Sequence, residues 1–85
     1  MRKEMSLAEL NPGESACIMN FKDKTVFSKM VELGCLPGEI VTLERKAPMG
    51  DPIIINTAGG KISLRKAEAT TIIVSENTLP AGEKQ

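Results

Sequence analysis

The sequence is poor in aromatic side chains and has no histidine. Its 85 residues include no Trp, no Tyr, no His and only two Phe, at Phe21 and Phe27. Proteins that bind single-stranded nucleic acids stack the bases on aromatic side chains, so two Phe argue against such a platform. Without His, a general base would have to be a carboxylate, a Lys or a Cys.

The chain has no excess of charge of either sign. Its 11 Lys and Arg balance its 11 Asp and Glu, so the formal net charge is zero. A nucleic-acid backbone is bound by clustered cations, and the nearest cluster, Lys61, Arg65 and Lys66, is interpreted as a solvated face. We therefore expect no nucleic-acid partner, although a nucleic-acid-binding small barrel remains an alternative function.

Long apolar runs are absent as well. No run approaches the ~20 residues of a membrane span, and the first five residues lack the apolar segment of a signal peptide. We expect a cytoplasmic protein that reaches a membrane only through a partner. Its two cysteines should then be free thiols. Cys17 lies in an apolar run and is expected to be buried. Cys35 follows a glycine and is expected to be more exposed.

The remaining pattern predicts short strands separated by turns that contain Pro and Gly. Predicted strands cover residues 15–21, 39–47, 53–57, 61–64 and 70–74. A helix is predicted at 23–33 and a helical turn at 65–69. Both faces of the 15–21 strand are apolar, so it should be enclosed. Five short strands bury their apolar side chains best as a small barrel. We expect one domain over residues 1–76 and a flexible tail over residues 77–85.

The predicted helix carries more apolar residues than one side of three turns needs. Val26, Phe27, Met30, Val31 and Leu33 recur at spacings of three and four residues. Val31 and Leu33 are expected in the core, whereas Phe27 and Met30 could equally line a partner-binding groove.

Two loop residues extend the set of candidate partner contacts. Leu36 follows the helix, and Met49 lies at the tip of the rigid loop between Pro48 and Pro52. The predicted partner-binding residues are therefore Phe27, Met30, Leu36 and Met49.

The sequence carries no catalytic or metal-binding motif. No Ser, Thr or Cys stands in a nucleophile motif, and Gly59-Gly60-Lys61 lacks the rest of a phosphate-binding loop. The candidate metal ligands Cys35, Asp51 and Glu68 are far apart in sequence. Asp51 is interpreted as capping its own turn and Glu68 as a surface charge. We expect no enzyme activity, no bound metal and no cofactor.

Several short segments, taken together, resemble the ferrous iron transport protein A (FeoA) family across roughly residues 6 to 76. They are Ser6-Leu7-Ala8-Glu9-Leu10 with Pro12-Gly13, Glu32-Leu33-Gly34 with Pro37-Gly38, Gly50-Asp51-Pro52-Ile53, and Leu64-Arg65-Lys66-Ala67-Glu68-Ala69 followed by Ile72 and Val74. Each segment alone is a common turn or helix end, but their order and spacing are typical of the family.

The resemblance implies a mainly β, SH3-like barrel of about five strands, with one α-helix inserted after the first strand. It also implies a cytosolic accessory protein of bacterial ferrous iron uptake, linked to iron only indirectly. Its partner would be the ferrous iron transporter FeoB, bound through the cytosolic GTP-binding region and modulated by that contact. A self-associating adaptor is the alternative, so a homo-oligomer is also considered.

Overall fold

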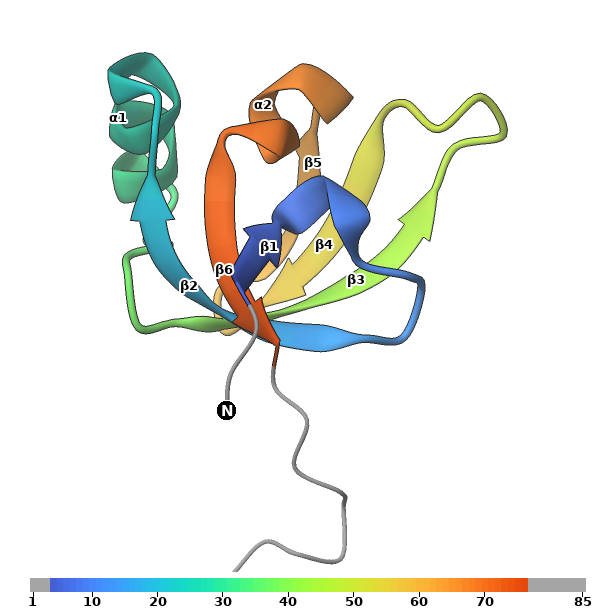
Figure 1. Ribbon diagram of the computed structural model, residues 1–85, viewed down its shortest axis with the longest axis horizontal. Coiled ribbons are helices and arrows are strands. Elements are labelled where there is room, and N and C mark those ends of the chain that lie inside the picture. The colour runs from blue at the N-terminus through green and yellow to red at the C-terminus, as the bar shows by residue number, and fades with distance from the viewer. Residues whose placement is uncertain (1–3, 77–85) are drawn as a thin grey trace, which may run out of the picture.

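The computed structural model describes residues 4–76, which form one antiparallel sheet with two helices and a short 3₁₀ helix (Figure 1). In chain order, the elements are β1 (Glu4–Ser6), η1 (Leu7–Glu9), β2 (Ser15–Phe21), α1 (Lys24–Glu32), β3 (Ile40–Lys46), β4 (Ile53–Thr57), β5 (Gly60–Leu64), α2 (Lys66–Thr70) and β6 (Ile72–Glu76). The chain is mainly β, as the sequence predicts.

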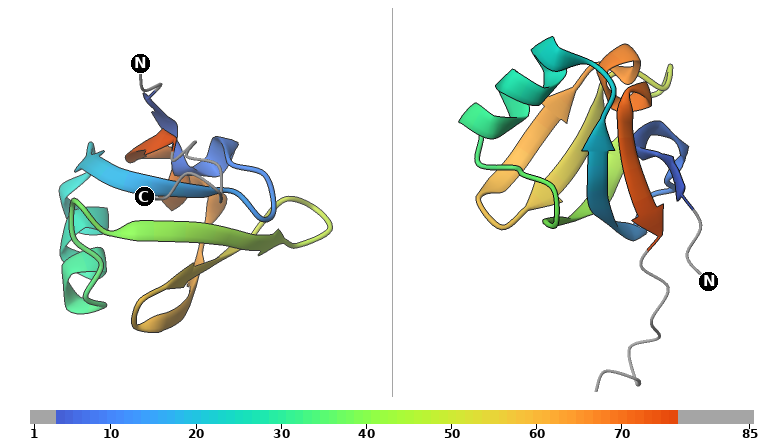
Figure 2. Two further views of the ribbon diagram at one scale, coloured as in Figure 1. Left: turned by 90° about the horizontal axis from the view of Figure 1, so that it is seen from below. Right: turned by 60° about the vertical axis from the view of Figure 1, so that its left-hand side comes forward.

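The sheet is strongly curled and has two free edges. Its strand order is β1-β6-β2-β3-β4-β5, and every neighbouring pair is antiparallel. The register shifts between Ile18 and Asn20 in β2 and between Leu43 and Arg45 in β3. Such irregularities increase local twist and bend a strand, which helps six short strands to wrap around one core. Figures 1 and 2 show this curvature.

The core lies inside the curl and is aliphatic. Along each strand the inward residues are buried and the outward ones are more exposed, because successive side chains point to opposite faces of a sheet. In β2, for example, Ala16 and Ile18 are fully buried, whereas Cys17 is half-buried and Met19 is exposed. The prediction that both faces of this strand are enclosed is therefore wrong.

One tight hairpin, one longer hairpin loop and a helical crossover connect the strands after α1. Ala58 and Gly59 join β4 to β5, and the longer loop of residues 47–52 joins β3 to β4. Helix α2 carries the chain from β5 to β6 and packs against η1. Ala69 of α2 and Leu7 of η1 are both fully buried, so these two short elements contribute to the core.

The structure differs from the sequence prediction mainly at the ends of the domain. It has six strands, because Glu4–Ser6 pairs with β6 as an additional strand, and α1 therefore follows the second strand. The last strand covers residues 72–76 instead of 70–74. The predicted tail, 77–85, lies outside the described residues. Within residues 4–76, no helix has the length and apolar character that crossing a membrane requires.

Candidate partner-binding surface

Helix α1 is held on the sheet by one narrow stripe of side chains. The Asp23 carboxylate caps its start by accepting a 3.0 Å hydrogen bond from the Val26 N–H. Gly34 follows its end with a φ of 81°, a left-handed conformation that glycine adopts without strain. Val26 and Met30 are one turn apart and are the helix's buried residues. The rest of α1 is therefore available to solvent or to a partner.

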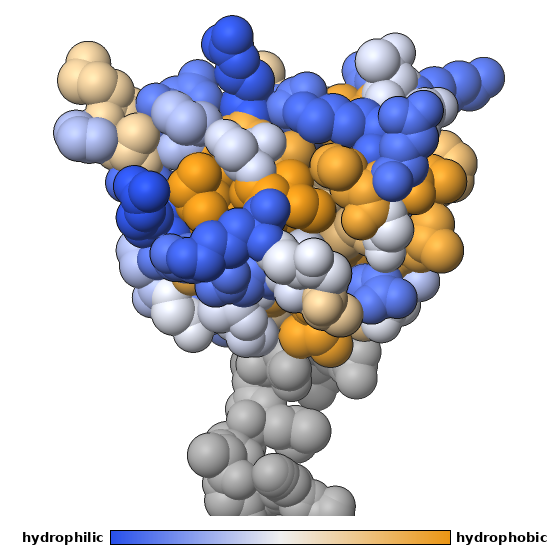
Figure 3. Space-filling model, turned by 180° about the vertical axis from the view of Figure 1, so that it is seen from behind, coloured by the Kyte–Doolittle hydropathy of each residue, from blue (hydrophilic) through white to orange (hydrophobic). Residues whose placement is uncertain are grey.

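A second apolar stripe of α1 remains exposed beside the buried one. Phe27 is 41% exposed and Val31, one turn later, is 39% exposed. Leu33 and Leu36, just beyond the helix, are 45% and 42% exposed. We call these four residues the α1 surface. Figure 3 shows apolar residues gathered on the side of the molecule where α1 lies.

This arrangement changes the sequence interpretation of the helix. Val31 and Leu33 were expected in the core, and that expectation is wrong. Met30 was a candidate partner contact, but it is fully buried. Met30 therefore supports the α1 surface from beneath and lies out of reach of a partner while α1 stays in place. Phe27 and Leu36 are exposed at the predicted surface.

The α1 surface borders a small hollow that a side chain could fill. The Phe21 and Phe27 rings lie with their centroids 5.3 Å apart at an angle of 59°. The hollow has a volume of about 220 Å³ and is lined by Asn20, Phe21, Lys24, Phe27 and Pro37. Its apolar walls suit an aliphatic or aromatic side chain of a partner.

Met49 lies far from the α1 surface. It is 90% exposed at the tip of the loop between β3 and β4. Figure 1 places this loop and α1 on opposite sides of the molecule. The structure therefore brings Phe27 and Leu36 to one region but leaves Met49 as a separate, isolated candidate.

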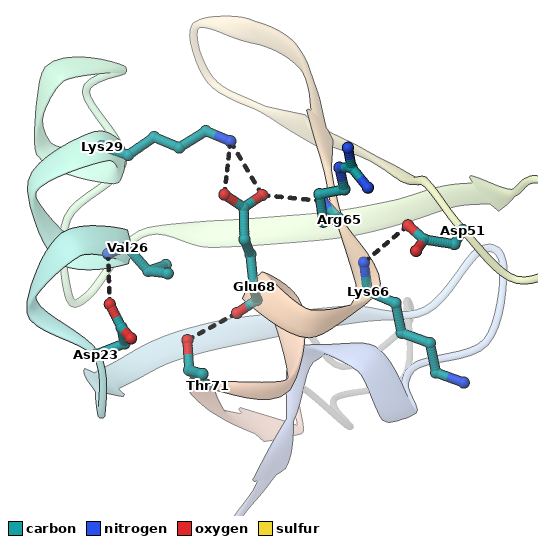
Figure 4. A network of polar contacts seen from close by, with 8 residues as sticks. All are labelled: Asp23, Val26, Lys29, Asp51, Arg65, Lys66, Glu68 and Thr71. Atoms are coloured by element: carbon teal, nitrogen blue, oxygen red, sulfur yellow. Dashed lines mark hydrogen bonds and ion pairs between the residues drawn. The ribbon is translucent and has the colours of Figure 1, made fainter.

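A polar network links α1 to α2 (Figure 4). The Lys29 Nζ donates to both Glu68 carboxylate oxygens, at 3.0 and 3.1 Å, and the Arg65 N–H donates to Glu68 Oε1 at 2.9 Å. The Arg65 N–H and then the Lys29 ammonium hold the pKa of Glu68 below its ordinary value. The Lys66 N–H donates to Asp51 Oδ1 at 2.9 Å.

Both carboxylates thus have structural roles that differ from the sequence interpretation. Glu68 joins two helices instead of being a simple surface charge. Asp51 caps the start of α2 instead of its own turn. The two residues also line one open pocket of about 460 Å³, together with Lys29, Pro52, Ser63 and Arg65. Sequence separation hid this proximity, because residues 51 and 68 meet only through the pairing of β4 with β5.

Comparison with known proteins identifies the family. Residues 5–76 match the FeoA domain. The chain belongs to the FeoA family. A FeoA-like protein from Clostridium acetobutylicum is 31% identical, with a TM-score of 0.81 over 100% of this chain and 99% of that one.

Two further relatives of this chain are a separate FeoA protein and a fusion protein that contains the domain. The FeoA of Stenotrophomonas maltophilia, solved with zinc and described as a prokaryotic SH3 domain protein, is 29% identical. Its TM-score is 0.72 over 82% of this chain and 88% of that one, and the predicted SH3-like fold is confirmed. A fusion of Fe(2+) transport protein A with the Fe(2+) transporter FeoB, from Porphyromonas gingivalis, is 34% identical over 71 residues. Those residues are 82% of this chain but only 8% of the fusion protein.

The candidate metal-binding side chains of residues 4–76 do not gather into one cluster. Among residues 4–76, no group of three or more His, Cys, Asp or Glu side chains is placed to hold a metal ion. Both cysteines are free, but their expected exposures are reversed: Cys35 is buried and Cys17 is half-buried. Burial, and then the nearby Glu39 charge, raise the pKa of the Cys35 thiol, so its reactive thiolate form is disfavoured.

Proposed function

We propose that this chain is an accessory protein of ferrous iron uptake and that it acts by binding the transporter FeoB through the α1 surface. The fusion of the two proteins in Porphyromonas gingivalis supports the role in ferrous iron uptake and the choice of FeoB as the partner. Domains joined in one polypeptide are held at a high effective concentration, which is of use when the domains interact. The cytosolic GTP-binding region of FeoB is the partner region we expect.

The exposed side chains of α1 support the choice of surface. Phe27, Val31 and Leu36 are each about two-fifths exposed and come from one helix and the loop after it. Partner surfaces commonly centre on an aromatic or aliphatic anchor that is fully desolvated on binding. Phe27 fits that role, because its ring already lies against Phe21 and needs little further ordering. No catalytic group is required for this function.

The test is binding of the full chain to the isolated cytosolic GTP-binding region of its host's FeoB, with and without GTP. The variant Phe27→Ala should weaken binding by roughly tenfold or more, which is typical of the loss of an interface anchor. The matched control is Met19→Ala, because Met19 is 42% exposed but lines a different pocket, with residues of β1 and β6. This control should bind within about twofold of the unchanged chain.

The melting temperature of each variant separates lost contact from lost fold. Absence of binding in both nucleotide states at high micromolar concentration would refute the proposed partner region. If Phe27→Ala and Met19→Ala weaken binding equally, the α1 surface is not the binding site, although FeoB remains the partner. Weakening by Met49→Ala alone would instead assign binding to the loop between β3 and β4.

A further inference from the structure

Strand β5 ends the sheet on a free edge. It pairs with β4 on one side, and no strand of the described chain pairs with its other side. An edge strand presents backbone N–H and C=O groups that can pair with another chain. Figure 2 shows β5 at the margin of the sheet, on the side where α1 lies.

The hairpin geometry identifies the backbone groups that are free. The two-residue turn at Ala58 and Gly59 makes Thr57 and Gly60 a hydrogen-bonded pair, and hydrogen-bonded pairs then alternate along the ladder. Ile62 therefore bonds to β4. Lys61 and Ser63 direct their N–H and C=O groups away from it. Within residues 4–76, no backbone hydrogen bond from a loop or cap occupies these four groups.

The side chains along this edge are cationic or small. Lys61, Ser63 and Arg65 all point outward and are exposed. Lys61 forms an ion pair with Glu44 at 3.1 Å, whereas Arg65 has no ion-pair partner among the described residues. Ser63 and Arg65 also line the 460 Å³ pocket, which lies at the end of the free edge. An added strand would therefore run alongside two cations, of which Lys61 is paired with Glu44. It would end at a pocket whose two carboxylates, Asp51 and Glu68, already accept hydrogen bonds within the domain.

We propose that the free edge of β5 binds an extended acidic peptide segment by strand addition. Two backbone pairs, at Lys61 and Ser63, would supply the hydrogen bonds. Carboxylates four residues apart in the segment would lie beside Lys61 and near Arg65, because alternate residues of a strand share one face. Opposite charges across neighbouring strands are mutually stabilising. This edge contains none of the residues of the α1 surface, so the proposal goes beyond FeoB binding through α1.

Charge disfavours a second copy of this chain as the occupant. Antiparallel pairing of two β5 edges centred on Ile62 sets Lys61 opposite Ser63 of the other copy. Lys61 of one copy then lies diagonal to Arg65 and Lys61 of the other. Residues at diagonal positions are within reach of long side chains, so such a dimer would gather four cations. An acidic segment removes that repulsion.

The probe is a synthetic peptide, acetyl-Ser-Glu-Val-Thr-Val-Glu-Ser-amide, titrated into the full chain and followed by amide resonances. Saturable downfield shifts and slowed hydrogen exchange are expected at the Lys61 and Ser63 amides. A peptide with Lys in place of both Glu should not bind. A peptide methylated on the Thr nitrogen should also lose binding, because that N–H faces β5 in the added strand.

Variants of the chain test the same contact from the other side. Ser63→Pro removes a free N–H without breaking the β4 ladder and should abolish binding, whereas the matched Ser63→Ala keeps the N–H and should retain it within about twofold. Arg65→Glu should weaken binding about fivefold. If Ser63→Pro does not fold, the methylated peptide still decides the question.

Three outcomes would overturn the proposal. The acidic peptide could fail to bind, its binding could shift amide resonances away from β5, or the Lys peptide could bind as tightly as the acidic one. Concentration-dependent shifts at Lys61 and Ser63 in the absence of peptide would overturn the acidic occupant in favour of a second copy. The Phe27→Ala variant should bind the peptide normally, so this test and the FeoB test can fail independently.

Discussion

Replacing Met30 by Ala should destabilise the domain more than any other change of a methionine to alanine among the described residues. Met30 is 0% exposed and is one of the two buried residues that attach α1 to the sheet. Truncating a buried Met to Ala costs about 2–5 kcal/mol, because apolar contacts are lost and a cavity remains. A domain of this length is stable by only roughly 4–13 kcal/mol. We therefore expect Met30→Ala to remove about 3 kcal/mol.

Thermal and urea unfolding measure this effect. For a domain of this size, 1 kcal/mol shifts the melting temperature by roughly 4–8 °C, so about 3 kcal/mol corresponds to a fall of roughly 12–24 °C. Met49→Ala is the matched control, because the same atoms are removed from a side chain that is 90% exposed. Its effect should stay within about 0.5 kcal/mol.

The comparison of the two methionine variants has a clear refuting result. Similar melting temperatures for Met30→Ala and Met49→Ala would mean that α1 contributes little to global stability. The inference that Met30 anchors the α1 surface would then be wrong. Amide exchange in α1 locates the effect, since exchange there should increase in Met30→Ala and stay unchanged in Met49→Ala.

Three further predictions concern polar and titratable groups. Glu68 has a lowered pKa in the folded protein, so its contribution to stability is present above the ordinary glutamate pKa and is lost as the pH falls through the folded value. Glu68→Gln should therefore lower the free energy of unfolding at pH 7. It should also make that free energy fall less between pH 7 and acid pH, which urea unfolding midpoints measure. An equally steep fall in the variant and in the unchanged chain would contradict this prediction. Cys17 should be alkylated in the native protein much faster than Cys35, which is buried with a raised pKa, and mass spectrometry of the Cys17→Ser and Cys35→Ser variants would reveal any reversal. The Ser75 Oγ is buried with no hydrogen-bond partner in the described part of the chain, so Ser75→Ala should leave the melting temperature unchanged or raise it, and a clear fall would indicate a hidden partner.

Local sequence signals predicted the elements whose formation is decided locally. The apolar spacing from Val26 to Leu33 was enough to place α1 within one residue at each end. The predicted strands at 53–57 and 61–64 likewise placed the turn between β4 and β5 within one residue. Strand β1 was missed because its three residues form a strand only by pairing with β6, some 70 positions away in the chain.

The candidate surface was predicted less well, because burial depends on packing between distant elements. Two adjacent apolar stripes of α1 are indistinguishable by spacing, yet the sheet covers Val26 and Met30 and leaves Phe27 and Val31 exposed. Cys17 was misplaced for a similar reason. Ala16, Cys17 and Ile18 are all apolar, so alternation alone does not indicate which of them face inward.

The pairing of β1 with β6 determines how the domain can be tethered. Glu4 of β1 lies opposite Ser75 of β6, so the chain enters and leaves the domain at neighbouring points. Figure 1 places these points at the end of the molecule away from α1. A polypeptide attached at either point would connect to the domain at this end and leave α1 exposed at the other end. Such a domain can be appended to a larger protein on either side without covering the surface that we propose for binding.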